Sequence, residues 1–137
     1  MVRVRTSRFM ETKIFTPAEL IKQIAKAGNY TTFHEIFTNE STKMYFDIEH
    51  DTIRLSAYKI TQTIQEVIQN YNVRIHIGDG TKPTKMSYHV VVDVKCNFDT
   101  NRFIAKLINA RVGNVCDCKV YAQNKSLRLP NCVKIDD

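Results

Sequence analysis

The sequence lacks the apolar segments that would carry a protein into or across a membrane. Its first ten residues, MVRVRTSRFM, contain no apolar core of a secretory signal peptide. No apolar run approaches the roughly 20 residues that a membrane-spanning helix needs. We therefore expect an intracellular protein, in the nucleus or the cytoplasm, that has no membrane partner and keeps its thiols reduced.

Linkers and repeats are also absent from the sequence. The 137 residues contain no internal repeat, no low-complexity tract and no stretch rich in Pro, Gly or Ser. With 43% hydrophobic and 25% charged residues, the composition is that of an ordinary globular protein. A chain of this length can bury a core of its own, so we expect a single domain over residues 1–137.

The four cysteines do not have the spacing of a zinc site. Zinc ligands usually come as C-x2–4-C pairs, whereas the closest pair here, Cys116 and Cys118, is C-x-C and has no second pair to complete it. We interpret these two, together with Cys96 and Cys132, as structural thiols, and we expect no zinc in this chain.

Positive charge prevails over negative charge only modestly. Twenty Lys and Arg residues against 14 Asp and Glu residues give a net charge of +6 and a pI near 9.2. This balance favours polyanionic partners such as nucleic acids, but many basic proteins bind none. The chemistry therefore has to be inferred from the pattern of individual residues.

Hydrophobic periodicity predicts regular elements along most of the chain. Thr16, followed by Pro17 and then Glu19, predicts the start of a helix that ends near Gly28. The later pattern predicts strands and helices in the order β-α-β-β-α-β, at residues 44–49, 56–70, 73–77, 85–94, 100–111 and 117–121.

That order predicts an α+β fold of the RRM-like, or ferredoxin-like, type: an antiparallel βαββαβ sheet with helices on one face. Its strands have the spatial order 4-1-3-2, which places residues 44–49 between residues 85–94 and 117–121. Residues 1–43 are expected to form an N-terminal helical extension, and residues 44–134 the core.

Two acidic residues share one face of the first predicted core strand. Side chains two positions apart on a strand point the same way, so Asp47 and Glu49 lie side by side, and a positive group should compensate them. The third and fourth strands carry further polar residues with the matching alternation. If these polar faces coincide, the carboxylates of Asp47, Glu49 and Asp117 converge, with Lys85, Ser87 and His89 beside them and Arg128 and Lys134 just beyond.

Three converging carboxylates favour a site for divalent cations. Mg²⁺ and Mn²⁺ prefer oxygen ligands, and two such ions can clamp a reacting phosphate from both sides. Neighbouring Lys and Arg side chains suit a polyphosphate, which they bind through its oxygens. The pattern therefore predicts nucleotidyl transfer with two ions of Mg²⁺ or Mn²⁺ as cofactors.

Three motifs resemble those of the archaeo-eukaryotic primase superfamily. FDIE at 46–49 is similar to its first motif, KMSYH at 85–89 resembles its K-x-S-x-H motif, and CDCKVYAQNKSLRLPNCVK at 116–134 resembles its third. The similarity is to the branch that contains primase-polymerases and the primases of herpesviruses and other large DNA viruses. It covers about residues 44–134.

The resemblance implies a DNA primase or primase-polymerase with an RRM-like catalytic core, acting on a single-stranded DNA template and nucleoside triphosphates. It also implies a virus-infected cell as the setting, and a helicase or zinc-binding segment outside this chain as a partner. The residues that it assigns are the metal ligands Asp47, Glu49 and Asp117, and the nucleotide-binding residues Lys85, Ser87, His89, Arg128 and Lys134.

Two other functions remain open from the residues themselves. A metal-dependent nuclease would use the same carboxylates for hydrolysis. A non-catalytic RRM-like module would bind nucleic acid with the acids as incidental surface groups, although such modules stack bases on aromatic residues of the central strands, where this sequence has Asp47, Glu49, Ser87 and His89.

Overall fold

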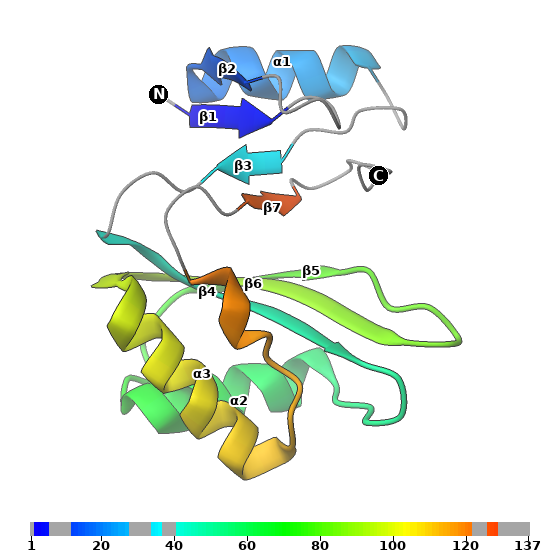
Figure 1. The fold of residues 1–137 in the computed structure, drawn as a ribbon, viewed down its shortest axis with the longest axis vertical. Coiled ribbons are helices and arrows are strands. Elements are labelled where there is room, and N and C mark those ends of the chain that lie inside the picture. The colour runs from blue at the N-terminus through cyan, green and yellow to red at the C-terminus, as the bar shows by residue number, and fades with distance from the viewer. Residues whose placement is uncertain (1, 6–11, 28–33, 37–40, 122–125, 129–137) are drawn as a thin grey trace. The chain divides into compact units, whose positions relative to one another are not determined.

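The structure is a computed structural model that describes residues 2–5, 12–27, 34–36, 41–121 and 126–128. The chain divides into two compact units, one formed by residues 1–38 and 123–137 and the other by residues 39–122 (Figure 1). The boundary falls a few residues before the expected start of the core at residue 44. Each unit is described by itself.

The described part of the first unit contains a four-stranded sheet and one helix. Its strands are β1 (Val2–Arg5), β2 (Thr12–Phe15), β3 (His34–Ile36) and β7 (Ser126–Arg128), in the order β2-β1-β3-β7 with every neighbour antiparallel. Helix α1 (Pro17–Ala27) begins where the sequence predicts, since Thr16 Oγ1 accepts from the Glu19 N–H and a Glu19 carboxylate oxygen accepts from the Thr16 N–H.

The second unit contains a three-stranded antiparallel sheet in the order β4-β6-β5. Its strands are β4 (Ser41–His50), β6 (Met86–Asn97) and β5 (Ile75–Asp79). Helix α2 (Ala57–Ile68) connects β4 to β5, and helix α3 (Phe98–Val112) follows β6 directly. Both helices lie on the same side of the sheet (Figure 1).

The core of this unit lies between the sheet and the two helices. Alternate residues of β4 and β6 point towards the helices, where the amphipathic faces of α2 and α3 cover them. Almost no surface of these side chains is exposed: Met44, Phe46, Ile48, Met86, Tyr88, Val90 and Val92 from the sheet, and Ile60, Ile64, Ala105 and Ile108 from the helices. The opposite face of the sheet carries polar residues of β4 and β6 together with Tyr45 and Val91.

The predicted fourth strand at residues 117–121 is wrong. The chain pairs with β4 through one antiparallel bridge, Ile48 to Cys116, and then turns into the short 3-10 helix η2 (Cys118–Val120). The turn forms because Asp117 Oδ1 accepts from the Lys119 N–H at 2.9 Å, a local bond that competes with strand pairing.

The second unit thus has mixed α and β structure around a three-stranded antiparallel sheet, and the described chain has three α-helices in all. Because the fourth strand is reduced to a bridge, the RRM-like assignment stays a prediction. Within the described residues, no helix is both long and apolar enough to span a membrane.

Candidate functional site

The register of β4 against β6 brings the residues of the first two motifs together. Asp47 lies directly opposite His89, and Glu49 directly opposite Ser87, so all four are on the face of the sheet away from the helices. His89 Nε2 lies 3.4 Å from Asp47 Oδ1. These two side chains are only 25% and 24% exposed, whereas the Glu49 side chain is 46% exposed.

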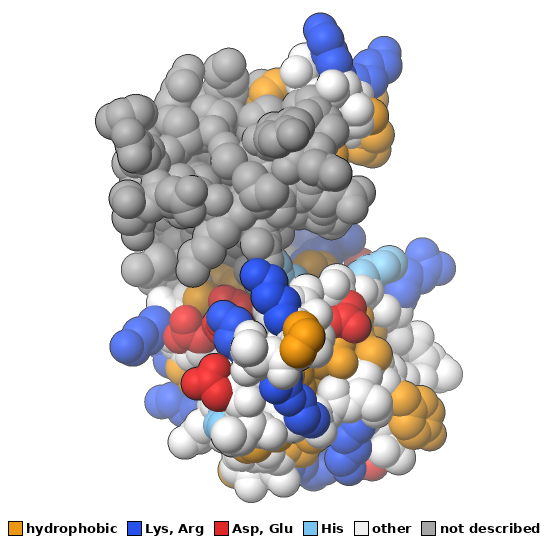
Figure 2. All heavy atoms as spheres, turned by 90° about the vertical axis from the view of Figure 1, so that its right-hand side faces the viewer, with side chains coloured by type: hydrophobic (Ala, Val, Ile, Leu, Met, Phe, Trp, Pro, Cys, Tyr) orange, Lys and Arg blue, Asp and Glu red, His pale blue; other side chains and the backbone are white. Residues whose placement is uncertain are grey.

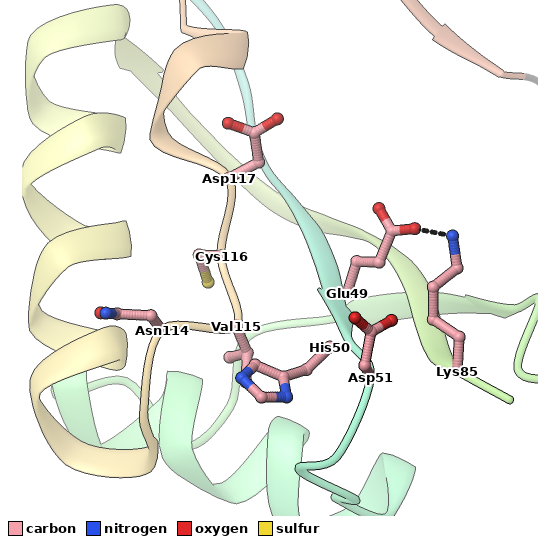
Figure 3. Close-up of a pocket in the computed structure, with 8 residues that line it drawn as sticks. All are labelled: Glu49, His50, Asp51, Lys85, Asn114, Val115, Cys116 and Asp117. Carbon is pink, nitrogen blue, oxygen red and sulfur yellow. Dashed lines mark ion pairs between the residues drawn. The ribbon is translucent and has the colours of Figure 1, made fainter.

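The single bridge on the other side of β4 adds Asp117 to the same face. The Asp117 N–H donates to the Asp47 carbonyl oxygen at 3.0 Å, and the Glu49 N–H donates to the Val115 carbonyl oxygen at 2.8 Å. These two bonds surround the pair of Ile48 and Cys116, so Asp117 lies beside Asp47. In Figure 3 the carboxyl groups of Glu49 and Asp117 are turned to the same side.

Lys85 supplies the positive charge that the paired acids require. Its ammonium group forms an ion pair with Glu49, which raises the pKa of Lys85 through their hydrogen bond and, next, through the charge of Glu49. The charges of Asp51 and Asp47 raise the pKa further. Since both partners of the pair are more than a third exposed, water screens the interaction and its contribution to stability is small.

A pocket of about 460 Å³ lies at this end of the sheet (Figure 3). It contains three of the predicted site residues, Glu49, Lys85 and Asp117. The others that line it are His50, Asp51, Asn114, Val115 and Cys116. Reasoning from the sequence missed His50, Asp51 and Asn114, although the first two follow the FDIE motif directly and could have been found from that position.

Two asparagines of α3 bind backbone groups near the edge of β4 where the fourth strand was predicted, one on β4 itself and one on the segment that bridges to it. Asn101, almost fully buried, accepts from the Tyr45 N–H and donates to the Tyr45 carbonyl oxygen, both at 3.0 Å. Asn109 accepts from the N–H groups of Val115 and Cys116 and donates to the Cys116 carbonyl oxygen. The second set of bonds fixes the chain immediately before Asp117.

A glycine turn leads from α3 into this segment. Gly113 has φ of +100°, which side-chain-bearing residues rarely adopt, and a Cβ added there would lie 2.5 Å from Ile53 Cδ1. The turn and the asparagine contacts together determine where Asn114 and Asp117 enter the pocket.

Tyr121 directly follows η2 and is not part of a strand. It is buried against Tyr45, with ring centroids 5.1 Å apart, and its hydroxyl donates to the Tyr45 carbonyl oxygen. The Tyr45 hydroxyl donates to the Val120 carbonyl oxygen. Burial raises the pKa of both tyrosines, and their rings pack against each other.

The described cysteines are free thiols. Cys116 is buried opposite Ile48, and burial, with smaller effects from Cys118 and Asp47, raises its pKa to about 12. Cys118 and Cys96 are only partly buried. Cys132 lies outside the described residues.

Two of the predicted nucleotide-binding residues are not part of this site as described. Arg128 lies in β7 of the first unit, and only its strand pairing, opposite His34, is described. Lys134 lies outside the described residues. The roles of both remain predictions.

Within the described residues, no group of three or more His, Cys, Asp or Glu side chains is arranged to hold a metal ion. The acids of the site are paired with cationic or hydrogen-bonding neighbours instead: Glu49 with Lys85, Asp47 with His89, and Asp117 with the Lys119 N–H. Asp47, Glu49 and Asp117 nevertheless present carboxylate oxygens, the donor type that Mg²⁺ and Mn²⁺ prefer, on one face of the sheet.

Neither a protein-family model nor a curated protein matches this sequence. The resemblance to primases therefore stays a prediction from the three sequence motifs.

Proposed function

We propose that the chain is the catalytic core of a template-directed nucleotidyltransferase, a DNA primase or primase-polymerase that joins nucleoside triphosphates on single-stranded DNA. The observation that carries the proposal is the bond from the Asp117 N–H to the Asp47 carbonyl oxygen. It joins residues 70 positions apart in sequence on the face that also carries Glu49 and His89.

The second motif supplies groups suited to a triphosphate on this face. Ser87 and His89 lie on β6 opposite Glu49 and Asp47, and Lys85 precedes them with the same alternation. Hydroxyl, imidazole N–H and ammonium groups all donate to phosphate oxygens. A triphosphate bound along these three residues would place its reacting phosphorus close to the carboxylates of β4, and the RRM-like topology suits such an arrangement.

Asp47, Glu49 and Asp117 are the residues that would hold Mg²⁺ or Mn²⁺. When bound there, two such ions would supply Lewis acidity and neutralise phosphate charge. The residues themselves orient the substrate, and Lys85 becomes available to phosphate once Glu49 is no longer its partner. No side-chain nucleophile is required, because the attacking group is the 3′-hydroxyl of the growing strand.

One observation favours a second candidate, a non-catalytic module that binds single-stranded nucleic acid. Lys85 compensates the charge of Glu49, and His89 Nε2 lies 3.4 Å from Asp47, so both acids have a neighbouring side chain without any metal. On the face of the second unit shown in Figure 2, basic and acidic side chains lie interspersed. A module of this kind would bind nucleic acid equally well in the presence of a chelator.

The test is extension of a primed single-stranded template with Mn²⁺ by wild-type protein and by Asp47→Asn and Asp117→Asn. Asparagine keeps the size of each side chain and, at position 117, an acceptor for the Lys119 N–H. We expect each substitution to reduce incorporation at least about 100-fold, as when an electrostatic group of a transition state is lost. Asp93→Asn is the matched control, because Asp93 is on β6, pairs with Lys43 and does not line the pocket.

Wild-type incorporation by both site variants would rule out the proposed roles of these acids. Shortening of the template, rather than growth of the primer, would indicate a nuclease. Binding of nucleic acid that needs no metal, with neither growth nor shortening, would establish the second candidate.

A further inference from the structure

Two glycines lie beside the second motif on the face of the sheet away from the helices. Gly78 on β5 is directly opposite His89. Gly80 follows this strand, and its N–H donates to the Ser87 carbonyl oxygen at 2.9 Å, so it is opposite Ser87. Residues directly opposite each other on antiparallel strands have their side chains on the same face. On the side of β6 away from β4, the Ser87 and His89 side chains therefore have bare backbone as their neighbour.

The backbone conformation requires neither glycine. Of the described glycines only Gly113 has a positive φ, so other residues can adopt the conformations of Gly78 and Gly80. The pairing of β5 with β6 is regular, without a bulge. A Cβ added at Gly78 would have one described atom within 4 Å, the His89 carbonyl oxygen at 3.7 Å, which is an ordinary contact. Glycine weakens a strand, and where no bulge or bend explains it, it often marks the close approach of a ligand.

Two lysines occupy the next positions on the same face, at the tip of the hairpin between β5 and β6. Lys82 and Lys85 are directly opposite, since each donates its N–H to the carbonyl oxygen of the other, and Arg54 holds the turn by donating to the Pro83 carbonyl oxygen. Lys85 pairs with Glu49 (Figure 3), whereas the Lys82 ammonium group has no partner within the described residues. Like charges directly opposite on a sheet repel, so an anion beside both is stabilised.

We propose that the triphosphate of the substrate lies against the bare backbone of Gly78 and Gly80, and that Lys82 binds its terminal phosphate. The inference rests on the proposed function, which brings a triphosphate to Ser87 and His89. Neighbouring strands are only about 4.8 Å apart, so a side chain on β5 would occupy the space that phosphate groups bound to β6 require. The ammonium group at the hairpin tip distinguishes a triphosphate from a diphosphate, because the shorter chain does not extend to it.

The experiment measures the affinity of the full chain for ATP and for ADP in the presence of Mn²⁺ by isothermal titration calorimetry, and the Tm of each protein by circular dichroism. The variants are Gly78→Val, Gly80→Val and Lys82→Gln. Valine is favoured in strands, so it should not lower the Tm. Lys106→Gln is the control for Lys82→Gln, because it removes the same charge at an exposed position of α3, on the other side of the sheet.

We expect wild-type protein and Lys106→Gln to bind ATP about tenfold more tightly than ADP, which corresponds to the loss of one hydrogen bond to a charged group at the lower end of its range. In Lys82→Gln the ratio should fall towards one. Each glycine variant should bind ATP at least about tenfold more weakly than wild-type protein, with a Tm that is equal or higher.

Glycine variants that bind ATP as wild-type protein does overturn the inference and leave the triphosphate site standing. A lower Tm in these variants also overturns it, because the glycines then serve the fold. The same holds for a Lys82→Gln protein that keeps the wild-type ratio, and for a wild-type protein that does not prefer ATP to ADP. Failure of the wild-type protein to bind either nucleotide removes the triphosphate site, and with it the proposed function.

Discussion

Asn101 is the residue whose replacement should destabilise the second unit most clearly. It is 1% exposed and lies on α3, with its side-chain amide bonded to both polar groups of the Tyr45 backbone. Asn101→Ala removes both bonds and puts no polar group in their place. Tyr45 precedes Asp47 by two residues, so the change acts on the edge of the strand that carries the site.

The expected loss of stability follows from the two hydrogen bonds. Each contributes about 1 kcal/mol, and the Tyr45 N–H, deprived of this acceptor in a buried place, adds a desolvation cost of about 1–3 kcal/mol. The Tyr45 carbonyl oxygen retains the Tyr121 hydroxyl at 2.8 Å, so no comparable cost is expected there. The free energy of unfolding should therefore fall by about 3–5 kcal/mol, a large part of the 5–15 kcal/mol typical of natural proteins.

Urea unfolding followed by far-UV circular dichroism measures this loss. The wild-type protein and Asn101→Ala should give the same dependence of free energy on urea, with a lower midpoint for the variant. Asn72→Ala is the control, since Asn72 is exposed and its side chain makes no hydrogen bond within the described residues; it should change stability by less than about 0.5 kcal/mol. An Asn101→Ala protein as stable as this control would refute the role assigned to Asn101 at the edge of β4.

Two further predictions concern neighbouring groups. Asn109→Ala removes three hydrogen bonds to Val115 and Cys116, so it should lower the free energy of unfolding by about 1–3 kcal/mol. Nucleotide incorporation should also fall, because Asp117 loses its fixed position. Unchanged incorporation by the folded variant would contradict this. Alkaline titration should yield no tyrosinate absorbance from two of the six tyrosines, Tyr45 and Tyr121, until circular dichroism shows unfolding. Burial raises both pKa values above the ordinary 10.0. The stability that the neutral phenols contribute is therefore complete below pH 10.0 and is lost as the pH rises above it. Titration of all six tyrosines in folded protein would be the contrary result.

Much of the local structure could be predicted from the sequence. The capping pattern at Thr16 and Glu19 predicts the start of α1, and the structure confirms it with both hydrogen bonds. The helical periodicity after residue 56 predicts α2, which begins at Ala57 with Ser56 as its cap. These signals are reliable because the interactions behind them connect residues three or four positions apart.

The fourth strand shows where such reasoning fails. Alternation over residues 117–121 favours a strand, but the Asp117 side chain bonds to the Lys119 N–H and the backbone turns. At the same edge, the side chain of Asn101 already occupies the Tyr45 backbone groups that a longer strand would use. The sequence offered one sign of this arrangement. Asn101 and Asn109 lie on one face of α3, and a buried asparagine needs a hydrogen-bonding partner, here the backbone beside the helix.

The sequence by itself determined that Asp47 and Glu49 share one face of β4, because alternation is a property of any extended chain. It could not determine that Asp117 lies beside Asp47, since that neighbour depends on one bridge and on a helix asparagine that holds the preceding residues. The pocket of His50, Asp51 and Asn114 likewise exists only in the folded chain. The position of a residue along a strand determines the face on which its side chain lies. Which residues from distant parts of the chain lie beside it depends on the groups that form hydrogen bonds with the backbone at the edge of the sheet.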